Sequence, residues 1–141
     1  MEYKRFNNTI ILRIDKEEEI IEKIKEVCEK EQVKLANING LGAVNKFVVG
    51  LLDTKEKKYY SQEYKGDFEI VSLTGSISTM DGEIYDHIHM SAGGRDNKIY
   101  GGHLNKANVS ATCEVFINIL DGEIDRKFSE EIGLNLIEFK E

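Results

Sequence analysis

A chain of 141 residues, 40% hydrophobic and 32% charged, is long enough to bury its own core and excludes an intrinsically disordered protein. The formal net charge of −7 argues against a nucleic-acid-binding protein, because much of such affinity comes from lysine and arginine side chains that neutralise phosphates. No apolar run approaches the ~20 residues of a membrane span, and no signal-peptide core is present, so we expect a cytoplasmic protein without a membrane partner.

The first half of the chain predicts a strand, a helix and then a series of short strands. Residues 3–14 alternate imperfectly between apolar and polar and predict the first strand. Asp15 is expected to cap a helix of about residues 16–31, because three glutamates follow it and apolar residues then recur at helical spacing. Strand-like runs interrupted by glycines and turns follow, at residues 33–38, 39–44, 47–52, 59–64 and 66–80.

Three motif-like features in this half have a structural explanation. A phosphate-binding loop at Gly40 and Gly42 would need a third glycine and a following helix, so we interpret these glycines as marking bulges, bends or points of close backbone approach. Ser76 lacks the G-x-S-x-G context of a nucleophilic serine. Cys28 and Cys113 have no CxxC spacing and fall on predicted apolar faces, so both are expected to be buried.

All three histidines lie in the hairpin predicted to follow the Asp81-Gly82 turn. His87 and His89 are two residues apart on a strand, so their side chains share one face. That face is polar, whereas the opposite face of residues 83–92 is mostly apolar apart from Asp86. A histidine on a polar face is less readily explained as a core residue.

The third histidine, His103, reaches the same face only if the hairpin loop has an odd number of residues. A loop at 94–96 would place His103 opposite His87, and a loop at 95–97 would place it opposite His89. Gly101 and Gly102 leave space beside His103 for a ligand or a neighbouring backbone. Either register predicts a cluster of three imidazoles.

The rest of the chain continues the sheet. A turn at residues 105–106 is predicted to lead into a strand at 107–120, whose polar face would extend from the histidines to Glu114. Residues 126–131 predict a short turn or helical piece, and residues 134–139 a last strand. No repeat or linker divides the chain, so a single domain of residues 1–141 is expected.

Three convergent imidazoles are a good ligand set for zinc or another divalent metal, and they leave a coordination position open. The alternative is that His87, His89 and His103 simply form hydrogen bonds with Tyr85, with Glu83 or with a neighbouring subunit. Glu114 and Glu83 are also the carboxylates considered as an acid or base for metal-dependent chemistry. No catalytic residue and no cofactor other than the metal is identified from the pattern.

Several blocks of the sequence, in this order and over nearly the whole chain, are similar to the PPC domain family, the "plants and prokaryotes conserved" domain. They are Gly40-Leu-Gly-Ala-Val44, Gly66-Asp-Phe-Glu-Ile-Val71, Ser72-Leu-Thr-Gly-Ser-Ile77, His87-Ile-His89, Gly101-Gly-His-Leu104 and Glu114-Val115. The resemblance implies an α+β fold, mainly an antiparallel β-sheet of about six to eight strands with one main helix packed on it. It also implies a homotrimer in which His87, His89 and His103 form a metal-binding cluster.

The resemblance leaves three functions open. The first is a homotrimeric module that binds a divalent metal, expected to be zinc. The second is a DNA-associated, transcription-regulatory protein, since plant members follow AT-hook motifs in DNA-binding proteins. Only the pairs Lys57-Lys58 and Arg126-Lys127 hint at basic patches here, and no proline is present to build such a hook. The third is a metal-dependent enzyme with a small-molecule ligand. Asp67 replaces the arginine of the plant motif and places a plant-like partner contact in doubt.

Overall fold

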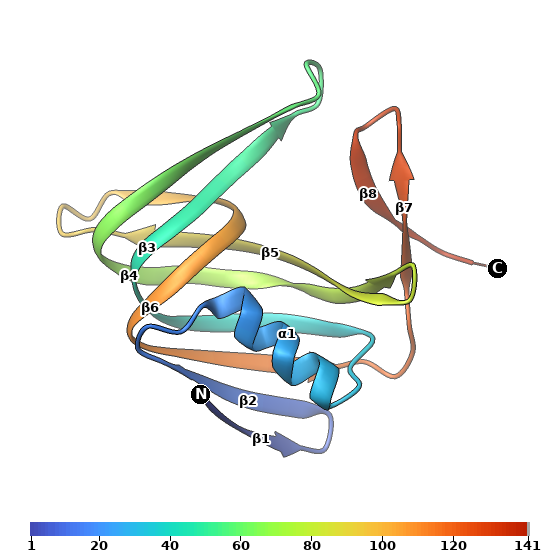
Figure 1. The fold of residues 1–141 in the computed structure, drawn as a ribbon, viewed down its shortest axis with the longest axis horizontal. Helices are drawn as coiled ribbons and strands as arrows, with labels where there is room; N and C mark the ends of the chain where they lie inside the picture. Colours follow the sequence, from blue (N-terminus) through green and yellow to red (C-terminus); the bar gives the residue numbers. More distant parts are fainter. Residues whose placement is uncertain (141) are drawn as a thin grey trace.

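The computed structural model describes residues 1–140, which form one helix and eight strands (Figure 1). In chain order they are β1 (Glu2–Phe6), β2 (Thr9–Asp15), α1 (Ile20–Lys30), β3 (Ala36–Asp53), β4 (Lys58–Met80), β5 (Glu83–Gly93), β6 (Ile99–Ile119), β7 (Asp125–Ser129) and β8 (Leu134–Glu138). Nearly all strand pairs are antiparallel, and a single main helix packs on them. The predicted α+β class is confirmed.

The four long strands close on themselves. β3 pairs with β4, β4 with β5, β5 with β6, and β6 returns to β3, so these strands form a ring. The last part of β6 also pairs with β2, which adds the β1–β2 hairpin to the sheet. The β7–β8 hairpin stands apart at the other end, and one parallel pair, Thr79 with Asp125, connects it to β4 (Figure 1).

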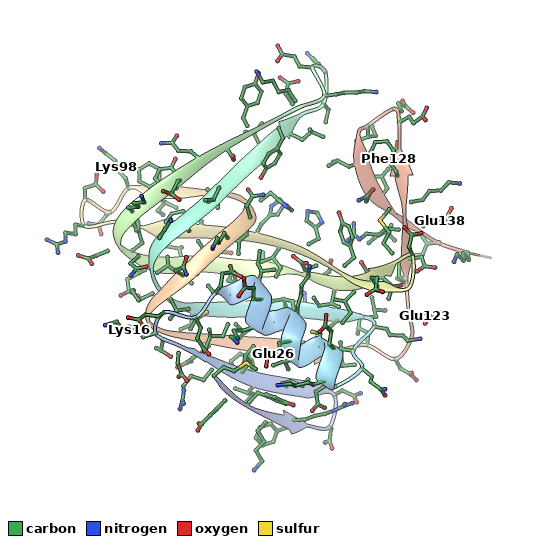
Figure 2. All side chains as sticks on the ribbon, viewed as in Figure 1. Lys16, Glu26, Lys98, Glu123, Phe128 and Glu138 are labelled. Atoms are coloured by element: carbon green, nitrogen blue, oxygen red, sulfur yellow. The ribbon has the colours of Figure 1, made fainter. Side chains whose placement is uncertain are left out.

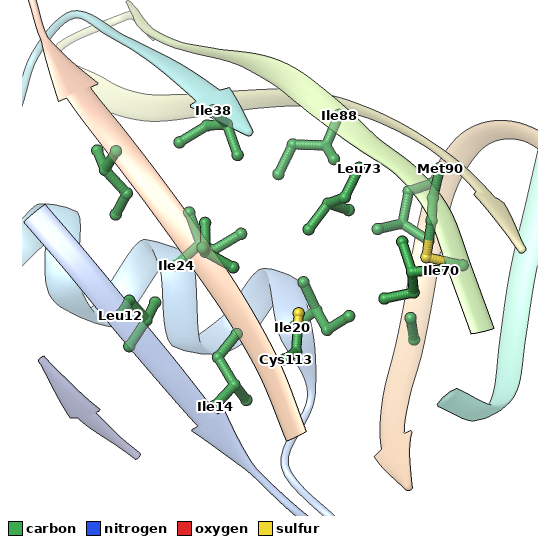
Figure 3. Close-up of a cluster of buried hydrophobic side chains, with 14 of the residues drawn as sticks. Leu12, Ile14, Ile20, Ile24, Ile38, Ile70, Leu73, Ile88, Met90 and Cys113 are labelled. Carbon is green, nitrogen blue, oxygen red and sulfur yellow. The ribbon is translucent and has the colours of Figure 1, made fainter. Parts of the chain in front are cut away.

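The core lies between α1 and the strands (Figure 3). The apolar stripe of α1 packs against β2, β5 and β6, and it is fully buried at Ile20, Ile24, Val27 and Cys28. Burial raises the pKa of the Cys28 thiol to about 12 and that of Cys113 equally, which makes both thiols unreactive. The prediction that the cysteines are buried is confirmed.

The helix begins later than the sequence predicts. Asp15 ends β2 and its carboxylate pairs with the terminal amine of Met1, so it does not cap the helix. The N–H of Glu17 donates to the carbonyl of Val109, and the N–H of Val109 donates to the carbonyl of Glu18, so the next residues are held against β6, with Glu17 in a left-handed conformation. This pairing delays the helix until Glu19, whose side chain is its N-cap. The helical stripe was predicted correctly, but its start was wrong.

Glu19 joins the helix to the sheet. Its buried carboxylate accepts a hydrogen bond of 2.7 Å from the backbone of Glu22 and one of 2.8 Å from the backbone of Ala107 in β6. Both donors would lose their acceptor in Glu19→Ala. We expect that variant to lower the free energy of unfolding by about 2–4 kcal/mol, measured by urea denaturation. Glu29→Ala, an exposed position on the same helix, is the matched control and should change it by less than about 0.5 kcal/mol.

Several predicted strands prove to be differently divided. Residues 3–14 are not one strand but the hairpin β1–β2, because Asn7 takes a left-handed conformation at the turn. The three runs between residues 33 and 52 belong mostly to one bent strand, β3, whose register shifts near Gly40 and Val44 reset the alternation. A side chain at Gly40 or Gly42 would collide with the β6 backbone, which confirms close approach and not a phosphate loop.

The later part of the chain brings two further corrections and one agreement. No turn occurs at residues 105–106, because β6 runs on and a register shift there moves the buried face from Leu104 to Ala107. Of residues 126–131, predicted as a short turn or helical piece, the first four belong to β7, and only Glu130 and Glu131 lie in a turn. The predicted turn at Asp81 and Gly82 is confirmed, with both residues at positive φ. No helix within residues 1–140 has the length and apolar character needed to cross a membrane.

Candidate metal centre

The β5–β6 hairpin brings the three histidines together. Its loop is Arg95–Asn97, closed by backbone bonds between Gly94 and both Asn97 and Lys98, with Asn97 in the left-handed conformation. This is the second of the two predicted registers, and it places His103 directly opposite His89. Asn97 explains the choice, because asparagine tolerates that conformation better than most residues.

The nitrogens of His87, His89 and His103 all lie within 4.8 Å of one another. None of the three side chains is fully buried, and each stands on the outer face of the ring, while Ile88 and Met90 point into the core. Tetrahedral zinc with bonds of about 2.0–2.1 Å requires ligand nitrogens about 3.3 Å apart. Small rotations of partly exposed imidazoles would close that difference, so the donor set fits a divalent metal.

The hydrogen-bonding alternative finds no support inside the chain. None of the three imidazoles forms a side-chain hydrogen bond with any of residues 1–140. The Tyr85 hydroxyl instead accepts a bond of 3.3 Å from the amide of Asn135. The carboxylates considered as partners do not join the cluster either. Glu83 lies at the first residue of β5, opposite Met80, and Glu114 lies on the part of β6 that pairs with β2, because β6 does not turn back as predicted. Asp86, the polar exception on the apolar face, pairs at 2.8 Å with Lys25 of α1.

The surroundings of two of the imidazoles lower their pKa values. Burial lowers the pKa of His87, and the neighbouring charges of His89 and Arg126 lower it further. Burial and then His89 lower the pKa of His103 in the same way. Neutral imidazole is the form that binds a metal, so these lowered pKa values favour the metal-binding form of His87 and His103.

The lowered pKa values predict how the metal-free protein responds to acid. Unfolded histidine takes up a proton near pH 6.5, before folded His87 and His103 do, so the free energy of unfolding should fall as the pH drops from about 7 toward 5. Urea denaturation in chelator at several pH values measures this. Carboxylates with a lowered pKa, such as Glu26 at about 2, change the free energy of unfolding mainly below pH 5, so they do not mask the effect of the histidines. An unchanged slope in the double variant His87→Asn, His103→Asn would contradict the assignment.

Tyr59 borders the cluster on the side of β3. Its ring meets the His103 imidazole edge to face at 6.2 Å, and its hydroxyl donates a bond of 2.6 Å to Asn105. The ring crosses Gly50, where an added Cβ would lie 2.6 Å from the Tyr59 oxygen. Gly102 is likewise pressed against the Gly50 backbone. The glycines beside His103 therefore admit neighbouring backbone, the second of the two predicted uses.

The opposite border contains a residue whose role the sequence did not reveal. Arg126 of β7 lies over the outer face of β4 and β5, where its guanidinium stacks on the Tyr85 ring at 4.7 Å. It donates bonds to the hydroxyls of Ser78 at 2.8 Å and Ser76 at 3.4 Å. Ser76 is the cross-strand neighbour of His87. No local pattern signals this contact, because Ser78 and Tyr85 lie more than 40 residues earlier in the chain.

Comparison with known proteins places this geometry in a family. The model of the Plants and Prokaryotes Conserved (PCC) domain, abbreviated PPC above, matches residues 1–121. The chain belongs to the PPC family. A PPC protein of Pyrococcus horikoshii is 33% identical, with a TM-score of 0.86 over 99% of this chain and 95% of that one. No curated protein sequence matches the chain.

Two further solved structures of this PPC fold carry functional descriptions. A metal-containing protein of Archaeoglobus fulgidus is 36% identical, with a TM-score of 0.88 over 98% of this chain and 97% of that one. A candidate DNA-binding protein of Bacteroides thetaiotaomicron is 29% identical, with a TM-score of 0.95 over 98% and 96% of the two chains. One of these two PPC relatives is thus described as containing metal, and the other as a candidate DNA-binding protein.

Proposed function

We propose that this PPC protein is a homotrimeric module that binds a divalent metal, zinc in the first instance, through His87, His89 and His103. The observation that carries the proposal is the convergence of three imidazoles, with one ligand nitrogen from each lying within 4.8 Å of the others, on an open face. The metal-containing relative from Archaeoglobus fulgidus supports it. A divalent metal held in this way would supply a Lewis acid to an oxygen atom of a small-molecule ligand.

Metal content tests the proposal directly. Protein purified without chelator, or stripped and then incubated with zinc, should retain about one zinc ion per chain after gel filtration, measured by elemental analysis. A protein that is metal-free when purified and takes up none of zinc, cobalt or manganese would refute it.

The trimer is supported by apolar side chains exposed on two facing parts of the molecule. The end of the β3–β4 hairpin, residues 51–60, and the β7–β8 hairpin project on the same side of β5 (Figure 1). Each borders the histidines, the first through the contact of Tyr59 with His103 and the second through the contact of Arg126 with Ser76, the neighbour of His87. Both expose large apolar side chains, which mark association surfaces when they gather. They are Leu51, Tyr59, Tyr60, Phe128, Leu134, Leu136, Ile137 and Phe139. β8 also has a free strand edge within residues 1–140.

A charge placed in this apolar group should break the assembly. Sedimentation equilibrium of the native protein should give about three times the 16.1 kDa of one chain. Phe128 is 55% exposed and is labelled in Figure 2. The substitution Phe128→Glu should shift the measured mass toward that of a single chain. Phe6→Glu is the control, because Phe6 is similarly exposed, at 49%, on the opposite edge of the sheet. Equal effects of the two variants would contradict the assignment of the surface.

DNA binding has less support from this chain than from the description of its relative. Of the two pairs that hinted at basic patches, Arg126-Lys127 offers one surface charge only, because Arg126 is buried. The ammonium group of Lys57 donates a hydrogen bond to the backbone oxygen of Glu130. With a net charge of −7, little remains to neutralise a phosphate backbone.

A further inference from the structure

Arg126 differs from the other three arginines of the chain. Arg5, Arg13 and Arg95 are exposed, and each pairs with at least one carboxylate. Arg126 is only 9% exposed and forms no salt bridge with any of residues 1–140. Arginine is rarely buried without a paired anion, because removing its charge from water is costly. The stacked Tyr85 ring and the bonded hydroxyls offset part of this cost without neutralising the charge.

The donors of Arg126 are not all used. The guanidinium has five N–H groups. One donates to Ser78, one on Nη1 donates to the backbone oxygen of Asn135 at 2.9 Å, and one on Nη2 makes the long contact of 3.4 Å with Ser76. The Nη2 group is therefore the weakly held part of the side chain.

That weakly held group lies beside the candidate metal centre. Ser76 and His87 are paired across β4 and β5, so their side chains stand on the same outer face, about 5 Å apart at Cβ. The contact of 3.4 Å between Nη2 of Arg126 and the Ser76 hydroxyl therefore lies next to His87. A buried cation with spare donors thus adjoins three solvent-accessible imidazoles.

We infer that Arg126 binds the oxyanion of a small-molecule ligand, a carboxylate or a phosphate ester, whose remainder extends over His87, His89 and His103. The inference builds on the proposed metal site, and it adds the chemical class of the ligand. Guanidinium binds carboxylate and phosphate through paired, charge-assisted hydrogen bonds. The anion supplies the counter-charge that residues 1–140 do not provide to Arg126.

Arginine side-chain NMR on the whole protein tests the inference. The Nε signal of Arg126, assigned by its loss in Arg126→Lys, is followed while acetate, malonate or inorganic phosphate is added to zinc-loaded protein. We expect a saturable shift of this signal, and the comparison of acetate and malonate with phosphate decides between a carboxylate and a phosphate ligand. Absence of a shift with all three anions, in protein shown by elemental analysis to contain zinc, would overturn the inference.

The same titration in chelator separates this inference from the metal proposal. If the protein binds no metal but an anion still shifts the Arg126 signal, the metal proposal fails and the anion site stands. If zinc is bound and no anion shifts the signal, the anion site fails and the metal proposal stands.

Variants distinguish anion binding from a structural role of Arg126. Anion affinity, measured by calorimetry, should fall about 10- to 100-fold in Arg126→Met, as expected for lost charged hydrogen bonds. Ser78→Ala removes the strongest bond that anchors the arginine to β4 but keeps its charge, so affinity should stay within about threefold of the native value. An equal loss in both variants would mean that Arg126 only holds the hairpin in place. Should Arg126→Met not fold, Arg126→Lys replaces it, with a loss of about tenfold expected.

Discussion

Replacing any one of the three histidines with asparagine should lower zinc affinity by more than about 100-fold. Loss of a group that merely hydrogen-bonds a metal ligand already costs about 10- to 100-fold, and loss of a ligand itself should cost more. His103→Asn is the most informative variant, because His103 comes from β6 and joins the cluster only through the β5–β6 pairing. Competition of zinc with a chromophoric chelator measures the affinity, and circular dichroism confirms that the variant is folded.

The controls for this experiment come from the same strands. Glu114→Gln, on β6, and Glu83→Gln, on β5, replace the carboxylates that the sequence suggested as partners, and neither lies in the cluster. Both should bind zinc like the native protein. Because the histidines are not fully buried, the free energy of unfolding of each asparagine variant in chelator should lie within about 1 kcal/mol of the native value. Retained zinc affinity in all three histidine variants would exclude the cluster as the site.

Gly75→Ala should be the most damaging small substitution in the histidine-bearing sheet. A Cβ at Gly75 would lie 2.2 Å from the backbone oxygen of His87 and 2.7 Å from the Cα of Ile88. These are backbone atoms of the paired strand and cannot rotate away, so β4 and β5 must separate next to His87. We expect the free energy of unfolding to fall by at least about 3 kcal/mol, measured by urea denaturation, and zinc affinity to fall with it.

Gly93→Ala is the matched control for that substitution. Its Cβ would meet nothing closer than 3.7 Å, and Gly93 lies on β5, paired with both β4 and β6. The free energy of unfolding should stay the same or rise by up to about 1 kcal/mol, because alanine restricts the unfolded chain. If the two alanine variants were equally stable, close approach of β4 to β5 would not be the reason for glycine at position 75.

Local pattern predicted the histidine cluster because strand alternation is a short-range property. Two residues of spacing put His87 and His89 on one face, and an odd loop brought His103 to it, whichever of the two registers was formed. The choice between registers depended on the conformation of Asn97, which the pattern does not encode. The apolar stripe of α1 was predicted for the same local reason, whereas its first residues were not, because they pair with Val109 on a distant strand.

The errors at residues 105–106 of β6 and at Arg126 of β7 have different physical causes. A two-residue turn and a one-residue bulge both shift the alternation of buried residues, so the sequence around residues 105–106 could not distinguish them. From the sequence, Arg126 was interpreted as part of an exposed basic pair. Its burial could not be predicted, because it depends on Ser78 and Tyr85, which lie more than 40 residues earlier in the chain. Contacts of that range leave no periodic signal.

The single pair that joins the β7–β8 hairpin to the ring has a consequence for how the molecule opens. Apart from Thr79 and Asp125, the hairpin is fixed to β4 and β5 by the side chains of Arg126 and Asn135, which contact Ser78 and Tyr85. It can therefore detach as a unit of local unfolding while the ring stays closed, at a smaller free energy than global unfolding. An anion that binds Arg126 in the docked form alone would reduce the detached population. Occupancy of the site and proteolytic resistance of the C-terminal hairpin would then rise together.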